Sequence, residues 1–146
     1  MANFSMEDLK TLRDRLGTGM VDTKKALEEA DGDLEKATEI LRLKGAKGNA
    51  KRADRSTSEG LVAAKETGNT ATLIELACET DFVAKADKFV ALADKVLDAV
   101  VAAGAKTVDE GLAASAGSQT VAELIADEAA IIGEKIELRR IAVIEA

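Results

Sequence analysis

Three amphipathic patterns follow one another in the first third of the chain. Apolar residues recur at spacings of three and four, which predicts helices over about 5–16, 21–30 and 33–45. Gly17 is expected to end the first helix, because glycine readily takes the left-handed conformation common at helix ends. Short helices joined by short loops predict a small orthogonal bundle over residues 1–45.

Residues 46–58 have no apolar stripe and are polar and basic, which predicts a linker. A contact with RNA is the alternative for this segment. It lacks interleaved aromatic side chains, on which unpaired bases stack, so we expect a solvated spacer and no direct nucleic-acid partner.

The rest of the chain begins with strand patterns. Leu61–Lys65 and Thr72–Cys78 are short apolar runs separated by Gly68-Asn69, a dipeptide typical of a tight turn, so they predict a β-hairpin. A regular stripe of apolar residues then predicts a long helix from about residue 86 to Gly104.

Two Thr-x-x-Glu sequences match the capping box that opens a helix, Thr107 with Glu110 and Thr120 with Glu123. The first is expected to open a short helix before a flexible Ala-Ser-Ala-Gly-Ser segment. The second is expected to open a helix that runs towards Ile132.

A final strand is predicted over residues 136–144. Its apolar positions change parity across Arg139-Arg140, and a β-bulge there would explain the change. Residues 59–146 are therefore predicted to form an α+β core subdomain, with about three antiparallel strands packed with helices. An exposed edge strand would offer a route to a homodimer. The whole chain is predicted to have a helix-rich α+β fold.

Charge argues against general nucleic-acid binding. The net charge is -7, and it is uneven: residues 1–55 carry 12 basic and 11 acidic side chains, whereas 56–146 carry 8 and 16. A general nucleic-acid binder needs a net basic face to neutralise phosphates.

Covalent catalysis is also disfavoured by the composition. The chain has no histidine and a single cysteine, Cys78, which excludes an imidazole base, a histidine or multi-thiolate zinc site and an internal disulfide. We expect no enzyme activity, no cofactor and no metal. Cys78 is expected to be a small buried apolar residue.

The sequence also indicates a cytoplasmic protein without a membrane partner. No run approaches the roughly 18 apolar residues that a membrane helix needs. The first eight residues lack the basic and apolar regions of a secretory signal.

The corner between the second predicted strand and the long helix carries Asp81 and Phe82. Phe82 is one of three phenylalanines in a chain without tryptophan or tyrosine. An exposed aromatic ring on a turn is a candidate anchor for a pocket on a partner. The alternatives are a ring packed back onto the helix stripe and, for Asp81, a helix N-cap.

Three motifs resemble those of the elongation factor Ts family, the guanine-nucleotide exchange factors of elongation factor Tu. They are Thr80-Asp81-Phe82-Val83-Ala84-Lys85 after Cys78, Thr18-Gly19-Met20-Val21-Asp22-Thr23-Lys24-Lys25-Ala26-Leu27, and Ile132-Gly133-Glu134 with Leu138-Arg139-Arg140. The resemblance covers the whole chain, but the chain is shorter than most members and looks truncated, so we expect their second core subdomain to be absent. It implies a ubiquitin-associated-like fold for residues 1–45.

The resemblance implies that the chain binds elongation factor Tu·GDP and promotes GDP release during translation elongation. By this resemblance, Asp81-Phe82 is inserted near the magnesium and phosphate site of the GTPase, with Thr80 and Val83 beside it.

The resemblance assigns further partner contacts to Arg13, Met20 and Val21, and another to Ile132. Val21 stands where many members have a second methionine. For Met20 and Ile132 the alternative is a place in the core.

Two other classes of function stay open. A non-catalytic protein-binding module could act through the three-helix domain, but this leaves Asp81-Phe82 without a role. An enzyme that uses carboxylates lacks an evident pair of converging acidic residues.

Overall fold

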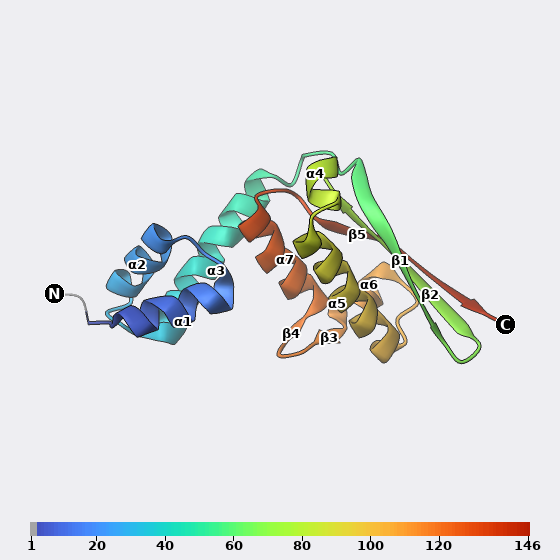
Figure 1. Cartoon of the computed structure of the whole chain (residues 1–146), viewed down its shortest axis with the longest axis horizontal. Helices are drawn as coiled ribbons and strands as arrows, with labels where there is room; N and C mark the ends of the chain where they lie inside the picture. Colours follow the sequence, from blue (N-terminus) through green and yellow to red (C-terminus); the bar gives the residue numbers. More distant parts are fainter. Residues whose placement is uncertain (1–2) are drawn as a thin grey trace.

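Three helices form a bundle around their own apolar cluster in the first third of the chain (Figure 1). This computed structural model describes residues 3–146, so the first two residues of the predicted bundle lie outside the described residues. The helices are α1 (Met6–Leu16), α2 (Met20–Glu29) and α3 (Leu34–Lys51). The buried cluster comprises Leu9, Leu12, Leu16, Ala26, Leu27, Ala30, Ala37 and Leu41.

Local signals set the ends of these helices. The Ser5 hydroxyl accepts a hydrogen bond from the Asp8 amide, and the Asp8 carboxylate accepts one from the Ser5 amide, which completes a capping box on α1. Gly17 ends α1 in the left-handed conformation, with φ of 67°. Asp33 caps the start of α3 through two amide hydrogen bonds. The predicted stop at Gly17 is confirmed.

The predicted stop of the third helix at Gly45 is wrong, because α3 continues to Lys51. The segment packs against α7 (Val121–Ile132) and gains tertiary support there. The Asn49 side-chain amide donates to the Ala126 carbonyl at 2.9 Å, and Arg52 donates to the Ala129 carbonyl at 3.5 Å. Residues 46–51, predicted as linker, are therefore helical.

A three-stranded antiparallel sheet follows, in the order β1-β2-β5. Its strands are β1 (Glu59–Thr67), β2 (Thr70–Cys78) and β5 (Glu137–Glu145). The turn at Gly68-Asn69 joins β1 to β2 as predicted, with Thr67 opposite Thr70. Glu75 lies opposite Arg140, but Leu76 lies opposite Leu138. Arg139 is thus the extra residue of a bulge, which confirms the predicted change of parity.

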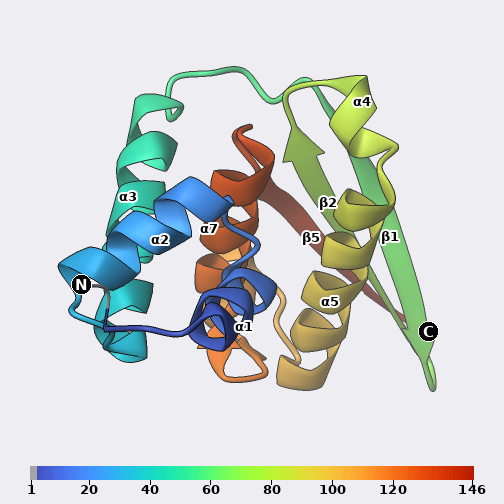
Figure 2. The same ribbon diagram turned by 60° about the vertical axis from the view of Figure 1, so that its left-hand side comes forward.

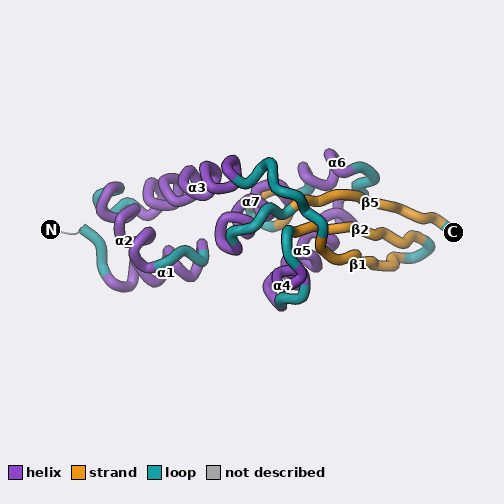
Figure 3. The backbone as a smooth tube through the Cα atoms, turned by 90° about the horizontal axis from the view of Figure 1, so that it is seen from above, coloured by secondary structure: helices purple, strands orange, loops and turns teal. Residues whose placement is uncertain are grey.

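Helices cover one face of this sheet (Figures 1 and 3). They are α5 (Asp87–Ala103), which packs against β1 and β2, and α6 (Val108–Ala113), which packs against β5. Ile74, Leu76 and Leu138 point into the core on this side, whereas Val62 and Ile144 on the opposite face are largely exposed. The helix-rich α+β fold is confirmed.

The segment that was expected to be flexible after α6 forms a small antiparallel hairpin. Its strands are β3 (Ser115–Ala116) and β4 (Gln119–Thr120). Gly117, with φ of 75°, supplies the turn. The expectation of a flexible segment is therefore corrected.

The two predicted capping boxes differ. At the start of α7, Thr120 and Glu123 exchange both hydrogen bonds of the box. The bonds that the Thr120 amide and hydroxyl donate to the Glu123 carboxylate lower the pKa of that carboxyl. At the start of α6, the Thr107 hydroxyl accepts from the Glu110 amide, but the Glu110 carboxylate accepts from the Lys106 amide instead of that of Thr107. The second box is confirmed and the first is only half formed.

The helices of residues 3–146 include none long and apolar enough to cross a membrane. β5 lies at an edge of the sheet, as the predicted route to a homodimer requires. That pairing, and the division into a bundle over 1–45 and a core subdomain over 59–146, stay predictions.

Two glycines of α3 allow a test of its packing against α7. A Cβ at Gly45 would lie 2.9 Å from the Ala130 Cβ, whereas at Gly48 it would meet only the guanidinium end of the long Arg52 side chain, at 3.3 Å. Both Gly→Ala changes raise helix propensity by about 1 kcal/mol. We expect Gly48→Ala to stabilise the protein and Gly45→Ala to destabilise it by about 1–3 kcal/mol through overpacking.

Urea unfolding of the two variants measures this difference. Equal stabilisation by both would contradict the close approach of α3 to α7.

Candidate functional site

Asp81 and Phe82 open α4 (Asp81–Ala84), a single turn of helix at the end of β2 (Figure 2). The Phe82 side chain is 84% exposed, so the alternative of a ring packed onto the helix stripe is wrong. Thr80 is the N-cap of α4, and its hydroxyl accepts from the Val83 amide at 3.4 Å. Asp81 is therefore the first helical residue and does not cap the helix. Its exposed carboxylate lies 3.8 Å from the Lys85 ammonium.

One side of α4 is anchored while the other faces outward. Val83 and Ala84 are half-buried and pack against the main hydrophobic core. This contact leaves Asp81 and Phe82 on the exposed side. The short helix thus presents a carboxylate next to a ring from a supported base.

The Glu134 carboxylate binds the corner between β2 and α4, which is formed by residues 79 and 80. Glu134 follows α7, and its Oε1 accepts from the amides of Glu79 and Thr80, each at 3.1 Å. Its Oε2 accepts from the Thr80 hydroxyl at 2.7 Å. One side chain therefore satisfies three donors at the corner.

The corner also accepts a hydrogen bond from the turn that follows α7. Glu79 Oε2 accepts from the Lys135 amide at 2.6 Å, and its Oε1 lies 3.4 Å from the Arg55 guanidinium. The Lys135 ammonium donates to the Ala53 carbonyl at 2.8 Å. The segment after α3, the corner and the turn after α7 are thus linked by hydrogen bonds.

Cys78 lies at the base of the corner. It is fully buried, as expected, and its thiol donates to the Thr80 carbonyl at 3.3 Å. Burial raises the pKa of the Cys78 thiol to about 11, and the Glu134 carboxylate adds to the rise. The thiol is a structural donor in this position rather than a reactive nucleophile.

Arg13, Met20 and Val21 form a second exposed group on the bundle. Met20 is 51% exposed and Val21 is 65% exposed, so the alternative of a core position for Met20 is wrong. The Arg13 Nε donates to the Thr18 carbonyl at 3.4 Å, across the loop that precedes α2. Figure 1 shows α2 at the left of the molecule and α4 at the top near its middle, with α3 and α7 between them. The structure does not bring the two groups together.

Ile132 belongs to neither group. It is half-buried at the end of α7 and packs against the core. Gly133 follows in the left-handed conformation, and Glu134 comes next. This geometry favours the core alternative for Ile132 and makes Glu134 the functional candidate of that motif.

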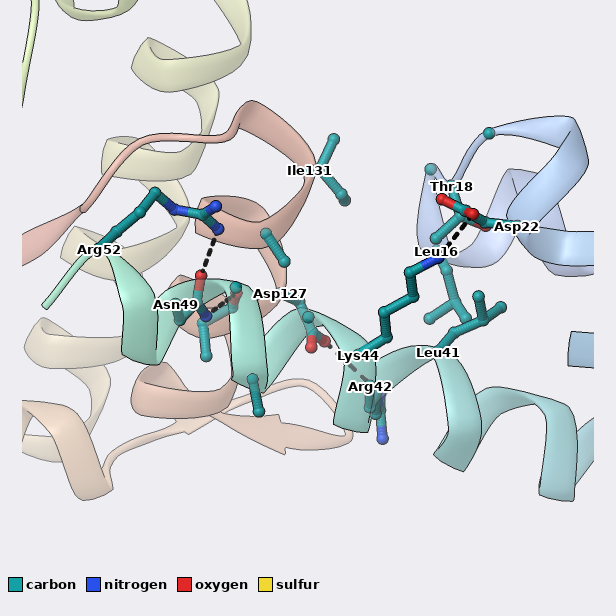
Figure 4. A pocket seen from close by; sticks show the side chains of 17 residues that line it. Leu16, Thr18, Asp22, Leu41, Arg42, Lys44, Asn49, Arg52, Asp127 and Ile131 are labelled. Atoms are coloured by element: carbon teal, nitrogen blue, oxygen red, sulfur yellow. Dashed lines mark hydrogen bonds and ion pairs between the residues drawn. The ribbon is translucent and has the colours of Figure 1, made fainter.

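A groove of about 600 Å³ lies between the bundle and α7 (Figure 4). Its charged side chains are largely paired: Arg42 with Asp127 at 3.6 Å, and Lys44 with Asp22 at 2.7 Å. Burial raises the pKa of the Asp127 carboxyl, and Arg42 partly opposes this. Because these charges are paired, the groove offers few unpaired charged groups to a ligand.

Sequence reasoning found the exposed residues of the site but missed its support. Glu134 is part of one of the three motifs and Glu79 directly precedes another, yet no role was assigned to either. Their partners are 54 to 56 residues away in the chain. No group of three potential metal ligands occurs within residues 3–146.

The reactivity of the single thiol tests how well Cys78 is buried. We expect Cys78 to react with a disulfide reagent at pH 8 at least about 100-fold more slowly in the folded chain than in urea, because burial and a raised pKa both suppress the thiolate. The rate in the folded chain should keep rising with pH above 9.0, the ordinary pKa of the thiol. Equal rates in the folded and unfolded protein would contradict the buried position.

Comparison with known proteins agrees with the three motifs. A family model described as Elongation factor TS matches residues 79–146. A protein named Elongation factor Ts from Leifsonia xyli subsp. xyli is 80% identical over 145 residues, which is 99% of this chain and 52% of the relative.

Proteins of the same name from two other organisms also match. The one from Clavibacter sepedonicus is 72% identical over 142 residues, and the one from Paenarthrobacter aurescens is 54% identical over 145 residues. These alignments cover 97% and 99% of this chain and 52% of each relative. The chain spans about half the length of the curated relatives it matches. Over that span, the chain belongs to the elongation factor Ts family.

Proposed function

We propose that the chain is a guanine-nucleotide exchange factor, which binds elongation factor Tu·GDP and promotes GDP release in translation elongation. In this proposal Asp81 and Phe82 are inserted into the GTPase domain of the partner, near the site that holds magnesium and the phosphates. Thr80 and Val83 lie beside them at the interface. The family assignment supports the choice of partner.

The observation that carries the proposal is the exposed ring of Phe82. It is 84% exposed on a corner whose base is buried and hydrogen-bonded. Burying a phenylalanine side chain is worth about 1.5–3 kcal/mol. A ring carried on a supported backbone loses less conformational entropy on binding than one on a flexible loop, so more of this energy is kept.

Exchange follows from differential binding and needs no covalent chemistry. An exchange factor that binds the nucleotide-free GTPase more tightly than the GDP-bound form lowers the affinity of the GTPase for GDP. The two affinities change by the same ratio, because coupling between two ligands is reciprocal. A wedge that displaces the groups around the metal and phosphates creates this difference. GDP or GTP that rebinds then expels the factor. We therefore infer that the protein is not an enzyme that makes or breaks covalent bonds.

The bundle supplies a second contact in this proposal. Arg13, Met20 and Val21 are exposed on α1 and the first turn of α2, where an arginine and two apolar side chains can bind another part of the GTPase domain. Ile132 is the further partner contact of this proposal, because it is only half-buried at the end of α7, although it also packs against the core. The bundle acting alone as a protein-binding module is the alternative, and it gives no role to Phe82.

The remaining proposals concern where the protein works, what it binds and how its chain is divided. We propose that it works in the cytoplasm, without a membrane or nucleic-acid partner, and that the open edge of β5 can pair with a second copy. The division into a bundle over 1–45 and a core subdomain over 59–146 belongs to the same proposal.

Replacing Phe82 by alanine tests the wedge. The expected result is loss of stimulated GDP release by about tenfold or more, since truncating a central aromatic anchor costs 2 kcal/mol or more. Stopped-flow release of a fluorescent GDP analogue from elongation factor Tu measures it. The thermal unfolding midpoint should not change, because the ring makes few contacts in the free protein.

Ile144→Ala is the matched control, since Ile144 is also apolar and 61% exposed but lies near the far end of β5. Its release rate should equal that of the unchanged chain. Stimulated release that survives Phe82→Ala would remove the wedge from the proposal.

Changing the second contact should affect a different kinetic quantity. In Met20→Ser with Val21→Ser, the concentration of factor for half-maximal stimulation should rise by about tenfold, because binding energy of about 1.4 kcal/mol is lost. The maximal rate should stay within about twofold, because this contact lies far from the wedge and binds both states alike. A fall in the maximal rate at unchanged half-saturation would contradict the assigned roles.

A further inference from the structure

The corner that carries Phe82 and the turn after α7 exchange hydrogen bonds in both directions. Glu134 accepts from the Glu79 amide, the Thr80 amide and the Thr80 hydroxyl, at 3.1, 3.1 and 2.7 Å. In return, Glu79 accepts from the Lys135 amide at 2.6 Å. Two adjacent residues on one segment thus bind two adjacent residues on the other.

The bonds to Glu134 determine how α4 begins. The Thr80 hydroxyl directs its hydrogen to Glu134 Oε2, so its oxygen lone pairs remain available to accept from the Val83 amide at 3.4 Å. That second bond is the N-cap of α4. The direction of the first helical turn, and with it the direction of Phe82, is therefore set through Thr80 by Glu134.

Few other contacts could hold the exposed side of α4 in place. The helix has four residues, too few to be stable alone, and none of its side chains is fully buried. The ion pair between Asp81 and Lys85 is exposed and adds little. Bonds to a carboxylate are stronger than neutral hydrogen bonds, so Glu134 provides the main polar restraint on the corner.

We propose that Glu134 is the positioning residue of the corner, which holds Phe82 in the direction needed for insertion into the partner, with Glu79 as its counterpart. This inference rests on the proposed exchange function. Glu134 acts through Thr80 and is half-buried below the corner. Loss of the Glu134 side chain therefore leaves Asp81 and Phe82 in the chain but lets their side chains point in several directions.

This role has a kinetic signature. When only a fraction of the corners point correctly, the step that depends on wedge insertion slows by that fraction. Contacts made by α1 and α2 of the bundle, which are separated from α4 by α3 and α7, should be unchanged (Figure 1). The maximal rate of GDP release should therefore fall while the half-saturating concentration changes little.

The experiment compares Glu134→Ala, Glu134→Gln and the control Glu66→Ala, which removes an exposed glutamate of β1 close to the hairpin turn. Glutamine keeps a carbonyl oxygen that can accept from both corner amides, and its NH₂ group can donate to the Thr80 oxygen. Two measurements are made on the whole chain. One is hydrogen exchange of the Glu79 and Thr80 amides in the free protein, and the other is GDP release over a range of factor concentrations.

We expect Glu134→Ala to speed exchange of both amides by about tenfold or more, since their acceptor is gone. It should lower the maximal release rate by about fivefold to tenfold, with half-saturation within about twofold. Glu134→Gln should restore most of both quantities, and Glu66→Ala should alter neither. If Glu134→Ala does not fold at the assay temperature, Glu134→Met takes its place, because methionine keeps about the same side-chain length but has no carboxylate oxygens to accept from the corner.

The outcomes separate the two proposals. If the unchanged chain accelerates GDP release and Glu134→Ala does so equally well, the positioning role is overturned while the exchange function stands. Unchanged protection of the Glu79 and Thr80 amides in Glu134→Ala would also overturn it. If the unchanged chain fails to accelerate release, the exchange function is overturned and the positioning role with it.

Discussion

A strand that turns directly into a helix must find hydrogen-bond acceptors for the amides at the corner, and this constraint shapes the core of the molecule. β2 is the central strand, and its pairing ends at Cys78. The next two amides are partly buried, and such groups are costly when unpaired. Glu134 supplies the acceptor from the turn between α7 and β5. The end of the central strand and the beginning of the edge strand are therefore held by the same bonds.

The three phenylalanines show how this core uses its few large side chains. Phe89 is fully buried between the sheet and the helices, and Phe4 packs against the cluster of the bundle. Apart from Cys78, the other residues of the two clusters are aliphatic. In a chain with so little aromatic area to bury, leaving Phe82 exposed gives up stabilising energy. Exposed aromatic residues on rigid corners are typical of surfaces that bind another protein.

Local signals in the sequence were sufficient for most element boundaries. Capping residues, the Gly68-Asn69 turn and the change of parity at Arg139 each depend on neighbouring residues, so they could be recognised without a structure. The extension of α3 could not, because its support comes from α7, 77 residues away along the chain. The same holds for Glu134, whose partners are set by the fold. The hairpin after α6 was missed because its strands are two residues long and lack any apolar pattern.

The close packing of α3 on α7 has a geometric consequence. A flexible spacer would let the bundle and the core subdomain adopt any separation, whereas a continuous helix bonded to α7 makes Met20 and Phe82 two points at a constant distance. Under the proposed function, the spacing of the two contacts is therefore set within this chain, by the packing of α3 on α7, and the partner has to accommodate it.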